Sequence, residues 1–319
     1  MTPATLLLID ANSLIHRAFH ALPPLTSPDG TPTQALYGVS SILLKILKES
    51  PPIYAAALFD RPEPTFRKKK YDAYKAQRPP APDTLISQII EAHHLFPAFG
   101  IPVFEKAGYE ADDLIATFAE KFKYEEGIRV VILTGDMDTL QLVEDPVVAV
   151  RALKTGVSDT ITFDEAGVRA KYGLPPSSLI DYKALVGDPS DNIKGLPGVG
   201  PKTAAELLQK FGSVKGIYAH PSDLSPGVKE KFSAHREEVT LAEELVILDR
   251  HAPVEIGSLE SLRLAEDDAQ TLAYFEKFGF QRLTDRFLKR NDPPPIETST
   301  SRPPKKPERA KPASTQSMF

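Results

Sequence analysis

The chain has 319 residues, 41% of them hydrophobic and 25% charged, with a formal net charge of −5, which suffices for one large or two smaller globular domains. It contains no cysteine, which excludes disulfides, zinc fingers and thiolate metal sites and leaves oxygen or imidazole ligands, suited to Mg²⁺ or Mn²⁺. No apolar run approaches the roughly 20 residues of a membrane span and no basic region precedes the first apolar stretch, so we expect a cytoplasmic protein with no membrane partner.

The first half of the chain alternates apolar β-rich runs with amphipathic helical patterns. The runs at 6–10, 53–60 and 129–136 (LLLID, IYAAALFD and RVVILTGD) predict buried strands of a mainly parallel sheet. Helical spacing follows in two sets of apolar residues: Val39, Ile42, Leu43, Ile46, Leu47, and then Leu114, Ile115, Phe118, Phe122. The expected class is α/β, a central sheet flanked by helices, over residues 1–174.

A basic strip follows the second predicted strand. Residues 61–80 hold seven basic and two acidic side chains, and Phe66, Tyr71 and Tyr74 lie among them. Aromatic faces interleaved with cations are what single-stranded nucleic acid binds, whereas a solvated charge run is the alternative. The strip, with little apolar periodicity, is predicted as an excursion from the sheet at about 61–83.

Each of the three predicted strands ends in an aspartate. These are Asp10, Asp60 and Asp136, with Asp138 two residues later. Because the carboxyl ends of parallel strands share one edge, where ligands bind in open α/β sheets, we expect the four side chains in one crevice. Each aspartate alone is equally compatible with a turn; their joint occurrence favours the crevice.

Two further acidic segments allow two interpretations each. Glu110, Asp112 and Asp113 open a predicted helix, where acids either cap the helix and complement its dipole or join the crevice. Asp188 and Asp191 flank Pro-Ser in VGDPSDN, which suits a tight turn as well as a pair of ligands.

From about Pro175 the β signal fades and helical patterns dominate, which predicts a helical lobe over 175–291. Within it GLPGVGPKTA, residues 195–204, predicts a helix-hairpin-helix at about 192–212. The backbone of Gly198 and Gly200, with Lys202 and Thr203 at the following helix start, could hold a DNA phosphate without reading bases. Residues 292–319 contain seven prolines and are predicted to be a disordered tail.

The acidic residues named above, taken together, indicate bound cations. Nine carboxylates in one crevice would repel each other and take up protons unless cations neutralised them. Since Mg²⁺ uses few direct carboxylates plus waters, two ions are indicated, and two ions about 4 Å apart can stabilise the attacking and leaving oxygens of a phosphodiester hydrolysis. The nine are Asp10, Asp60, Glu110, Asp112, Asp113, Asp136, Asp138, Asp188 and Asp191.

The same segments, in this order, resemble the 5′ nucleases, the family of bacterial polymerase I exonuclease domains, phage 5′ exonucleases and flap endonucleases. The resemblance covers about 6–288 and rests on LLLIDANSLIHRAFHAL, FDRPEPTFRKKKYDAYKAQRP, GYEADDLIAT, LTGDMDTLQLV and DYKALVGDPSDNIKGLPGVGPKTA. It implies a PIN-like nuclease domain with a helical arch, a helical lobe with a helix-3-turn-helix, and 5′-3′ exonuclease and 5′ flap endonuclease activity in DNA replication and repair.

The resemblance also implies roles for particular residues. All nine acids would be ligands, directly or through water, of two Mg²⁺ ions that Mn²⁺ can replace, with Asp60 and Asp136 in the catalytic group. Lys75 and Arg78 would lie on the arch, Lys75 near the scissile phosphate, with Arg17, Arg67 and Tyr74 as further DNA contacts. Gly198, Gly200, Lys202 and Thr203 would grip duplex DNA, with K⁺ at the hairpin carbonyls.

The expected partners are DNA with 5′ ends or flaps, RNA primers, and a separate DNA polymerase, for a monomer acting at the bacterial nucleoid. Met137 departs from the pattern, since similar bacterial proteins usually carry lysine between the two aspartates of Asp-x-Asp. Two other functions stay open: a catalytically silent DNA-junction binding protein, and a small-molecule phosphatase that would use neither the strip nor the hairpin.

Overall fold

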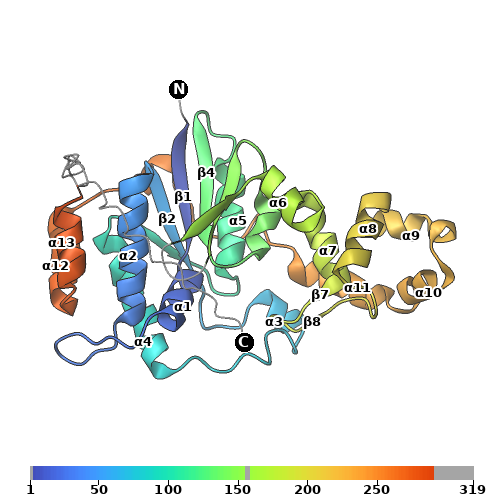
Figure 1. The fold of residues 1–319 in the computed structure, drawn as a ribbon, viewed down its shortest axis with the longest axis horizontal. Coiled ribbons are helices and arrows are strands. Elements are labelled where there is room, and N and C mark those ends of the chain that lie inside the picture. Colours follow the sequence, from blue (N-terminus) through green and yellow to red (C-terminus); the bar gives the residue numbers. More distant parts are fainter. Residues whose placement is uncertain (1–2, 155–158, 291–319) are drawn as a thin grey trace, which may run out of the picture.

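The computed structural model describes residues 3–154 and 159–290, so the predicted tail lies outside the described residues. A six-stranded sheet with strand order β3-β2-β1-β4-β5-β6 forms its centre (Figure 1). All neighbours are parallel except β6, which runs antiparallel to β5. The strands are β1 (Ala4–Asp10), β2 (Tyr54–Phe59), β3 (Val103–Glu105), β4 (Ile128–Thr134), β5 (Val148–Leu153) and β6 (Thr160–Phe163). The predicted α/β class with a mainly parallel sheet is confirmed.

Strand β1 is apolar from Leu6 to Ile9 because both of its faces are covered. It pairs with β2 on one side and β4 on the other. Leu7 and Ile9 enter one hydrophobic core while Leu6 and Leu8 enter the core on the opposite face, as the two-residue strand period requires. Consecutive apolar residues are typical of a parallel strand that is covered on both faces.

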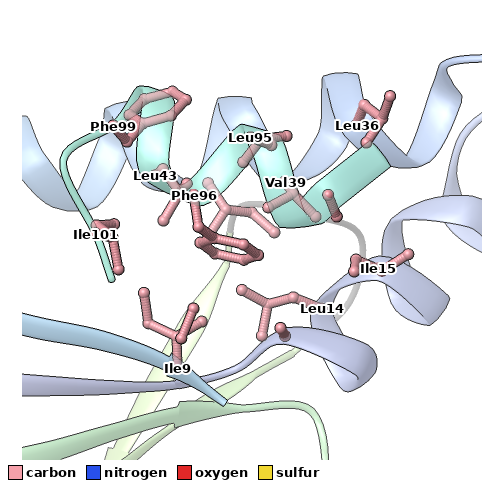
Figure 2. Close-up of a cluster of buried hydrophobic side chains, with 14 of the residues drawn as sticks. Ile9, Leu14, Ile15, Leu36, Val39, Leu43, Leu95, Phe96, Phe99 and Ile101 are labelled. Atoms are coloured by element: carbon pink, nitrogen blue, oxygen red, sulfur yellow. The ribbon is translucent and has the colours of Figure 1, made fainter. Parts of the chain in front are cut away.

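Among the described residues, five helices contribute to the core on the first face. They are α1 (Ala11–Ala21), α2 (Gln34–Glu49), α4 (Asp83–Ala98), α12 (Asp268–Phe278) and α13 (Gln281–Leu288). Figure 2 shows the centre of this core, where Phe96 of α4 lies between Ile9 of β1, Leu14 of α1 and Val39 of α2. This packing holds α1, which begins directly after the end of β1, against the sheet.

The second face is covered mainly by α5 (Ala111–Phe122), with α6 (Glu165–Tyr172) and the 3₁₀ helix η1 (Asp138–Leu142). Leu114, Ile115 and Phe118 of α5 are fully buried, as the predicted helical spacing requires. The segment after the helical lobe completes this core with Leu248, Ala252 and Leu262.

The helical lobe has its own core and lies to one side of the sheet, at the right in Figure 1. It contains α7 (Leu179–Val186), β7 (Gly187–Asp188), β8 (Ile193–Lys194), α8 (Pro201–Phe211), α9 (Val214–Ala219), α10 (Pro226–Ala234) and α11 (Arg236–Val246). Gly187 and Gly195 let two backbone segments cross at close range, because a Cβ on Gly195 would lie 2.4 Å from the nitrogen of Gly187. The remaining 3₁₀ helices are η2 (Pro176–Ser178), η3 (Pro221–Asp223) and η4 (Leu259–Leu262).

Helices α12 and α13 do not belong to the helical lobe, which was predicted to cover residues 175–291. Helices α12 and α13 contact α4, α2 and each other, and Phe275 and Leu283 are fully buried in the first-face core. The lobe therefore ends near α11, and the chain returns to the α/β body. None of the helices in the described parts of the chain is long and apolar enough to cross a membrane.

The basic strip also differs from its prediction. Only α3 (Phe66–Lys70) is α-helical; residues 72–77 form turns, and extended chain leads to α4. The strip is not a detached excursion, because Arg67 is 1% and Tyr74 4% exposed. Tyr74 belongs to the core of the helical lobe, so the strip joins the two parts of the molecule.

Replacing Phe275 with alanine should lower the free energy of unfolding by about 3–5 kcal/mol, because it leaves a cavity where α12 meets the body. Urea denaturation measures this. Leu288→Ala is the control, since Leu288 is 61% exposed and should change stability by less than about 0.5 kcal/mol. Equal effects of the two changes would contradict the packing of α12 as part of this core.

Candidate functional site

Asp10 lies where β1 ends and α1 begins. Its Oδ1 accepts a hydrogen bond from the Ser13 backbone N–H at 3.0 Å, and its Oδ2 accepts one from the Thr134 hydroxyl at 2.6 Å. The side chain is 4% exposed. Burial raises the pKa of Asp10 to about 7, with Asp60 and Asp136 adding to the rise against these two hydrogen bonds. The fold therefore holds this carboxylate where its ionised form is disfavoured.

Asp60, Asp112 and Asp136 complete one acidic group with Asp10. Asp60 accepts from the backbone N–H of Ala111 at 2.7 Å, and its own N–H donates to the Asn12 carboxamide oxygen at 3.1 Å. All four acids line one cavity of about 260 Å³, together with Asn12, Ser13, His16, Lys75, Arg78, Glu110 and Ala111. We call Asp10, Asp60, Asp112 and Asp136 the strand-end group.

The chemistry of the strand-end group fits a divalent metal ion. Asp112 Oδ1 is buried and has no hydrogen-bond partner among the residues that the structure describes. Burial raises the pKa of Asp112 well above its usual range, and Asp10, Asp136 and Asp138 raise it further. A buried carboxylate oxygen without a hydrogen-bond donor, in a cavity that three further carboxylates line, suits a hard cation.

A second acidic group comprises Asp138, Asp188 and Asp191, each with a carboxylate oxygen within 4.8 Å of the others. We call it the turn group, because Asp188 accepts from the Ser190 backbone N–H at 2.9 Å and so forms the predicted turn. Its carboxylates already have cationic partners. Lys183 of α7 contacts Asp138 and lies 2.8 Å from Asp188, and Arg78 lies 2.6 Å from Asp191.

Glu110 connects the acids to the basic strip. It caps α5 in a capping box with Asp113, as the alternative interpretation of GYEADD predicted. Its carboxylate also lies 2.9 Å from the Lys75 ammonium and 3.0 Å from the Tyr74 hydroxyl. Glu110 thus serves as a helix cap and as a contact for the strip over the site.

Asp113 and Arg67 differ from their predicted roles. They form a two-pronged ion pair with both N–O distances at 2.7 Å, and Asp113 is 0% exposed. Arg67 also donates to the carbonyls of Leu245 and Ile247, while Asp113 accepts from the Asp249 N–H. Because both side chains are buried and fully engaged, Asp113 is not placed to bind metal, nor Arg67 to contact a phosphate.

Lys75 and Arg78 line the cavity of the strand-end group, but from a segment of turns and bends and not from the predicted helical arch. Lys75 has the left-handed φ of 54°, which disfavours a side chain with a Cβ. Its backbone N–H donates to the Asp191 carbonyl at 3.0 Å, which holds it there. Such strain is often found where a side chain must be aimed. The strip therefore presents two cations to the cavity.

The other predicted DNA contacts lie elsewhere. Gly198 has a φ of 72°, and Gly200 precedes α8, whose second and third residues are Lys202 and Thr203. The hairpin thus lies between α7 and α8, and the Lys202 side chain is 91% exposed. Figure 1 shows α8 in the helical lobe, away from α1 and the strand ends. Arg17 donates to the Leu153 carbonyl at the end of β5.

Several residues of the site were missed by the sequence analysis. Asn12 and Thr134 hold Asp60 and Asp10, and Lys183 bridges two acids of the turn group. Asn12 and Thr134 could have been found from their places beside strand-end aspartates. Lys183 carries no such signal, since it appears as an ordinary helical lysine. Met137 packs against the second-face core.

Two family models match the chain. Residues 5–173 match the 5′-3′ exonuclease N-terminal resolvase-like domain, and residues 174–270 match the 5′-3′ exonuclease C-terminal SAM fold. A 5′-3′ exonuclease of Aquifex aeolicus is 40% identical over 268 residues, 84% of this chain and 89% of the relative. DNA polymerase I of Bacillus caldotenax is 39% identical over 282 residues, 88% of this chain and 32% of the relative.

Solved structures share the fold. A bacteriophage T5 flap endonuclease in a complex with DNA and metal ions has a TM-score of 0.61 at 20% identity and covers 90% of this chain and 98% of its own. The catalytic core of Rad2 in complex with a DNA substrate has a TM-score of 0.57 at 16% identity and covers 91% and 93%. This chain spans about a third of the polymerase I relatives but most of the Aquifex exonuclease.

Replacing Arg67 with alanine should cost about 3–5 kcal/mol of stability, because it leaves the Asp113 carboxylate buried and unpaired. Thermal and urea unfolding measure the loss. Arg61→Ala is the matched control, since Arg61 pairs with Glu63 and Glu105 at the surface and should cost less than about 1 kcal/mol. An Arg67→Ala protein of normal stability with weakened DNA binding would restore the predicted phosphate contact.

Metal should stabilise the protein more at about pH 8 than at about pH 5.5. The folded-state pKa values of Asp10 and Asp138 are raised from 3.8 to about 7, so their contribution to stability is full below the unfolded-state value and is lost as the pH rises toward 7. Melting temperatures with Mg²⁺ and with EDTA at both pH values test this, and Asp10→Asn should reduce the difference. A Mg²⁺ effect that is equal at both pH values would contradict it.

Proposed function

The chain belongs to the 5′-3′ exonuclease family, and we propose that it hydrolyses DNA phosphodiester bonds near 5′ ends, as a 5′-3′ exonuclease and a 5′ flap endonuclease. The observation that carries the proposal is the cavity in which the strand-end group faces Lys75 and Arg78. Carboxylates on one side and cations on the other form a surface for metal ions and a phosphate between them.

We further propose that the two groups of acids hold two Mg²⁺ ions, which Mn²⁺ can replace. Asp10, Asp60, Asp112 and Asp136 would hold one ion, and Asp138, Asp188 and Asp191 the other, with Glu110 between them. Bound metal would supply Lewis-acid stabilisation of the charge that develops on the phosphate oxygens. Asn12, Ser13 and Thr134 keep Asp10 and Asp60 in position through the hydrogen bonds described above.

Lys75 and Arg78 are proposed to receive the scissile phosphate. Lys75 is held by its backbone and by Glu110. Burial alone would lower the pKa of Lys75, but Glu110 and Asp191 raise it, so its ammonium stays charged. Arg78 is more exposed and suits a two-pronged contact with a phosphate. Positive charge fixed beside the phosphate stabilises a transition state in which negative charge increases.

The hairpin and α8 are proposed to hold the duplex away from the cut. The exposed Lys202 and the start of α8 after Gly200 suit a phosphate of either strand. A K⁺ ion at the hairpin carbonyls is part of the same proposal. Separate contacts for duplex and 5′ strand give selectivity for a junction between them.

The wider role follows from the relatives. Because polymerase I relatives carry this chain's counterpart within a longer protein, we propose that it removes 5′ flaps and RNA primers in replication and repair, together with a DNA polymerase. A monomer in the cytoplasm suffices for this role. A small-molecule phosphatase would leave the strip and the hairpin without a purpose.

Asp136→Ala should leave DNA binding measurable while turnover falls by about two orders of magnitude or more, because a ligand at the cleavage site is lost. The assay uses a 3′-labelled 5′-flap duplex in Mg²⁺ beside EDTA, with products resolved by length and binding measured in Ca²⁺. Asp223→Ala, at an exposed aspartate of the helical lobe, is the control and should cut at the normal rate.

Cleavage near the junction that needs Mg²⁺ supports the proposal. Unchanged turnover of Asp136→Ala would contradict its assignment as a ligand. Binding of the flap without cleavage in Mg²⁺ or Mn²⁺ would favour a silent junction-binding protein instead.

A further inference from the structure

The two acidic groups differ in what neutralises them. Among the described residues, no lysine or arginine forms an ion pair with Asp10, Asp60, Asp112 or Asp136. Every acid of the turn group has such a partner: Lys183 for Asp138 and Asp188, and Arg78, with Lys75 farther away at 3.9 Å, for Asp191. The strand-end group thus has no ion pair in the described parts of the chain, whereas the carboxylates of the turn group are paired with the protein's own cations.

Lys183 places its ammonium between two carboxylates of the turn group. It lies on α7, five residues before Asp188, and its ammonium contacts oxygens of both Asp138 and Asp188. Its side chain is 19% exposed. An ammonium and a divalent ion cannot occupy the same point between the same two oxygens, so one must leave for the other to bind.

We propose that Lys183 is an internal counter-ion that competes with the metal of the turn group and thereby makes the two ions bind in order. The inference rests on the proposed function, because it takes the turn group as a metal site. The strand-end group, whose acids form no ion pair in the described parts of the chain, binds its ion first and tightly. The turn group binds second and weakly, when Lys183 swings away on its flexible stem.

Arg78 connects this order to the substrate. Its guanidinium is half exposed and pairs with Asp191 at 2.6 Å, and a DNA phosphate offers it a competing two-pronged partner. When the phosphate draws Arg78 away, Oδ1 of Asp191 becomes available to the second ion, while Oδ2 keeps the Tyr74 hydroxyl at 3.0 Å and the Lys75 ammonium at 3.9 Å. Binding of DNA and of the second ion must then favour each other, because such coupling is reciprocal.

This arrangement gives Lys183 a purpose that a purely structural lysine would lack. A lysine that only stabilised the fold would weaken both metal sites when removed, through local unfolding. A competing lysine, when removed, strengthens the site that it blocked and leaves the other unchanged. The two roles therefore predict changes of opposite sign in the same measurement.

The test is Mn²⁺ binding to the full chain, followed by the electron paramagnetic resonance signal of free Mn²⁺. The wild type should show one tight and one weak site. Lys183→Met should lower the Kd of the weak site by about tenfold or more, and change the tight site by less than about threefold. Adding to the wild type a flap DNA that cannot be cleaved should likewise lower the Kd of the weak site.

Three variants serve as controls. Lys183→Arg keeps the charge and should retain a weak second site. Lys229→Met makes the same chemical change at an exposed lysine of α10 and should bind Mn²⁺ as the wild type does. Should Lys183→Met fold poorly in EDTA, Lys183→Gln keeps a hydrogen-bonding side chain without the charge and should tighten the weak site likewise.

The outcomes separate the two proposals. A weak site that is unchanged or weaker in Lys183→Met and Lys183→Gln would overturn the competition. Mn²⁺ binding that Asp10→Asn leaves intact, or no binding at all, would instead contradict the metal site of the proposed function. Tightening in Lys183→Met but not in Lys183→Arg supports the role of Lys183 as counter-ion.

Discussion

Repulsion between carboxylates governs the architecture around the strand ends. Negative charges brought together at the edge of a sheet, partly out of water, are stable only if something neutralises them. The chain does this in three ways. Asp113 is paired permanently with Arg67 in the interior, the turn group is paired exchangeably with Lys183 and Arg78, and the strand-end group has raised pKa values for Asp10 and Asp112. The first way only stabilises the fold, whereas the other two leave acids that can bind a ligand.

The sheet provides the place where these charges meet. Strand order changes direction at β1, which has β2 on one side and β4 on the other, and such switch points leave a crevice beyond the carboxyl ends of the strands. Asp10 stands at the end of β1 itself, with Asp60 and Asp136 just beyond its two neighbours. Helix α5 begins beside them and brings Asp112, while the N–H of Ala111 is directed at Asp60. Four elements distant in sequence thus share one cavity through topology alone.

Much of this could be predicted from sequence, because apolar runs ending in aspartate report both the strand and its end. The limits have physical causes. Asp112 and Asp113 are adjacent and chemically identical, yet one faces the cavity and the other faces Arg67, and this depends on the rotation of α5 against the sheet. Lys183 lacks a local signal, because its partners are set by how α7 packs. The packing of α12 and α13 on the α/β body was missed because a helical pattern indicates which face of a helix is buried. It does not indicate which other element covers that face.

The basic strip shows how an acidic protein can receive a polyanion. The net charge of −5 would repel DNA if it were evenly spread, but the field that a ligand meets depends on where charges lie. Here Lys75 and Arg78 stand over the acids and are attracted to them, so the strip is folded before any phosphate arrives. The same attraction limits the affinity for phosphate, since each cation must exchange one anionic partner for another. In a site built from such exchangeable ion pairs, the protein's own cations neutralise the acids before the ligands bind. These cations can still exchange partners when the ligands arrive.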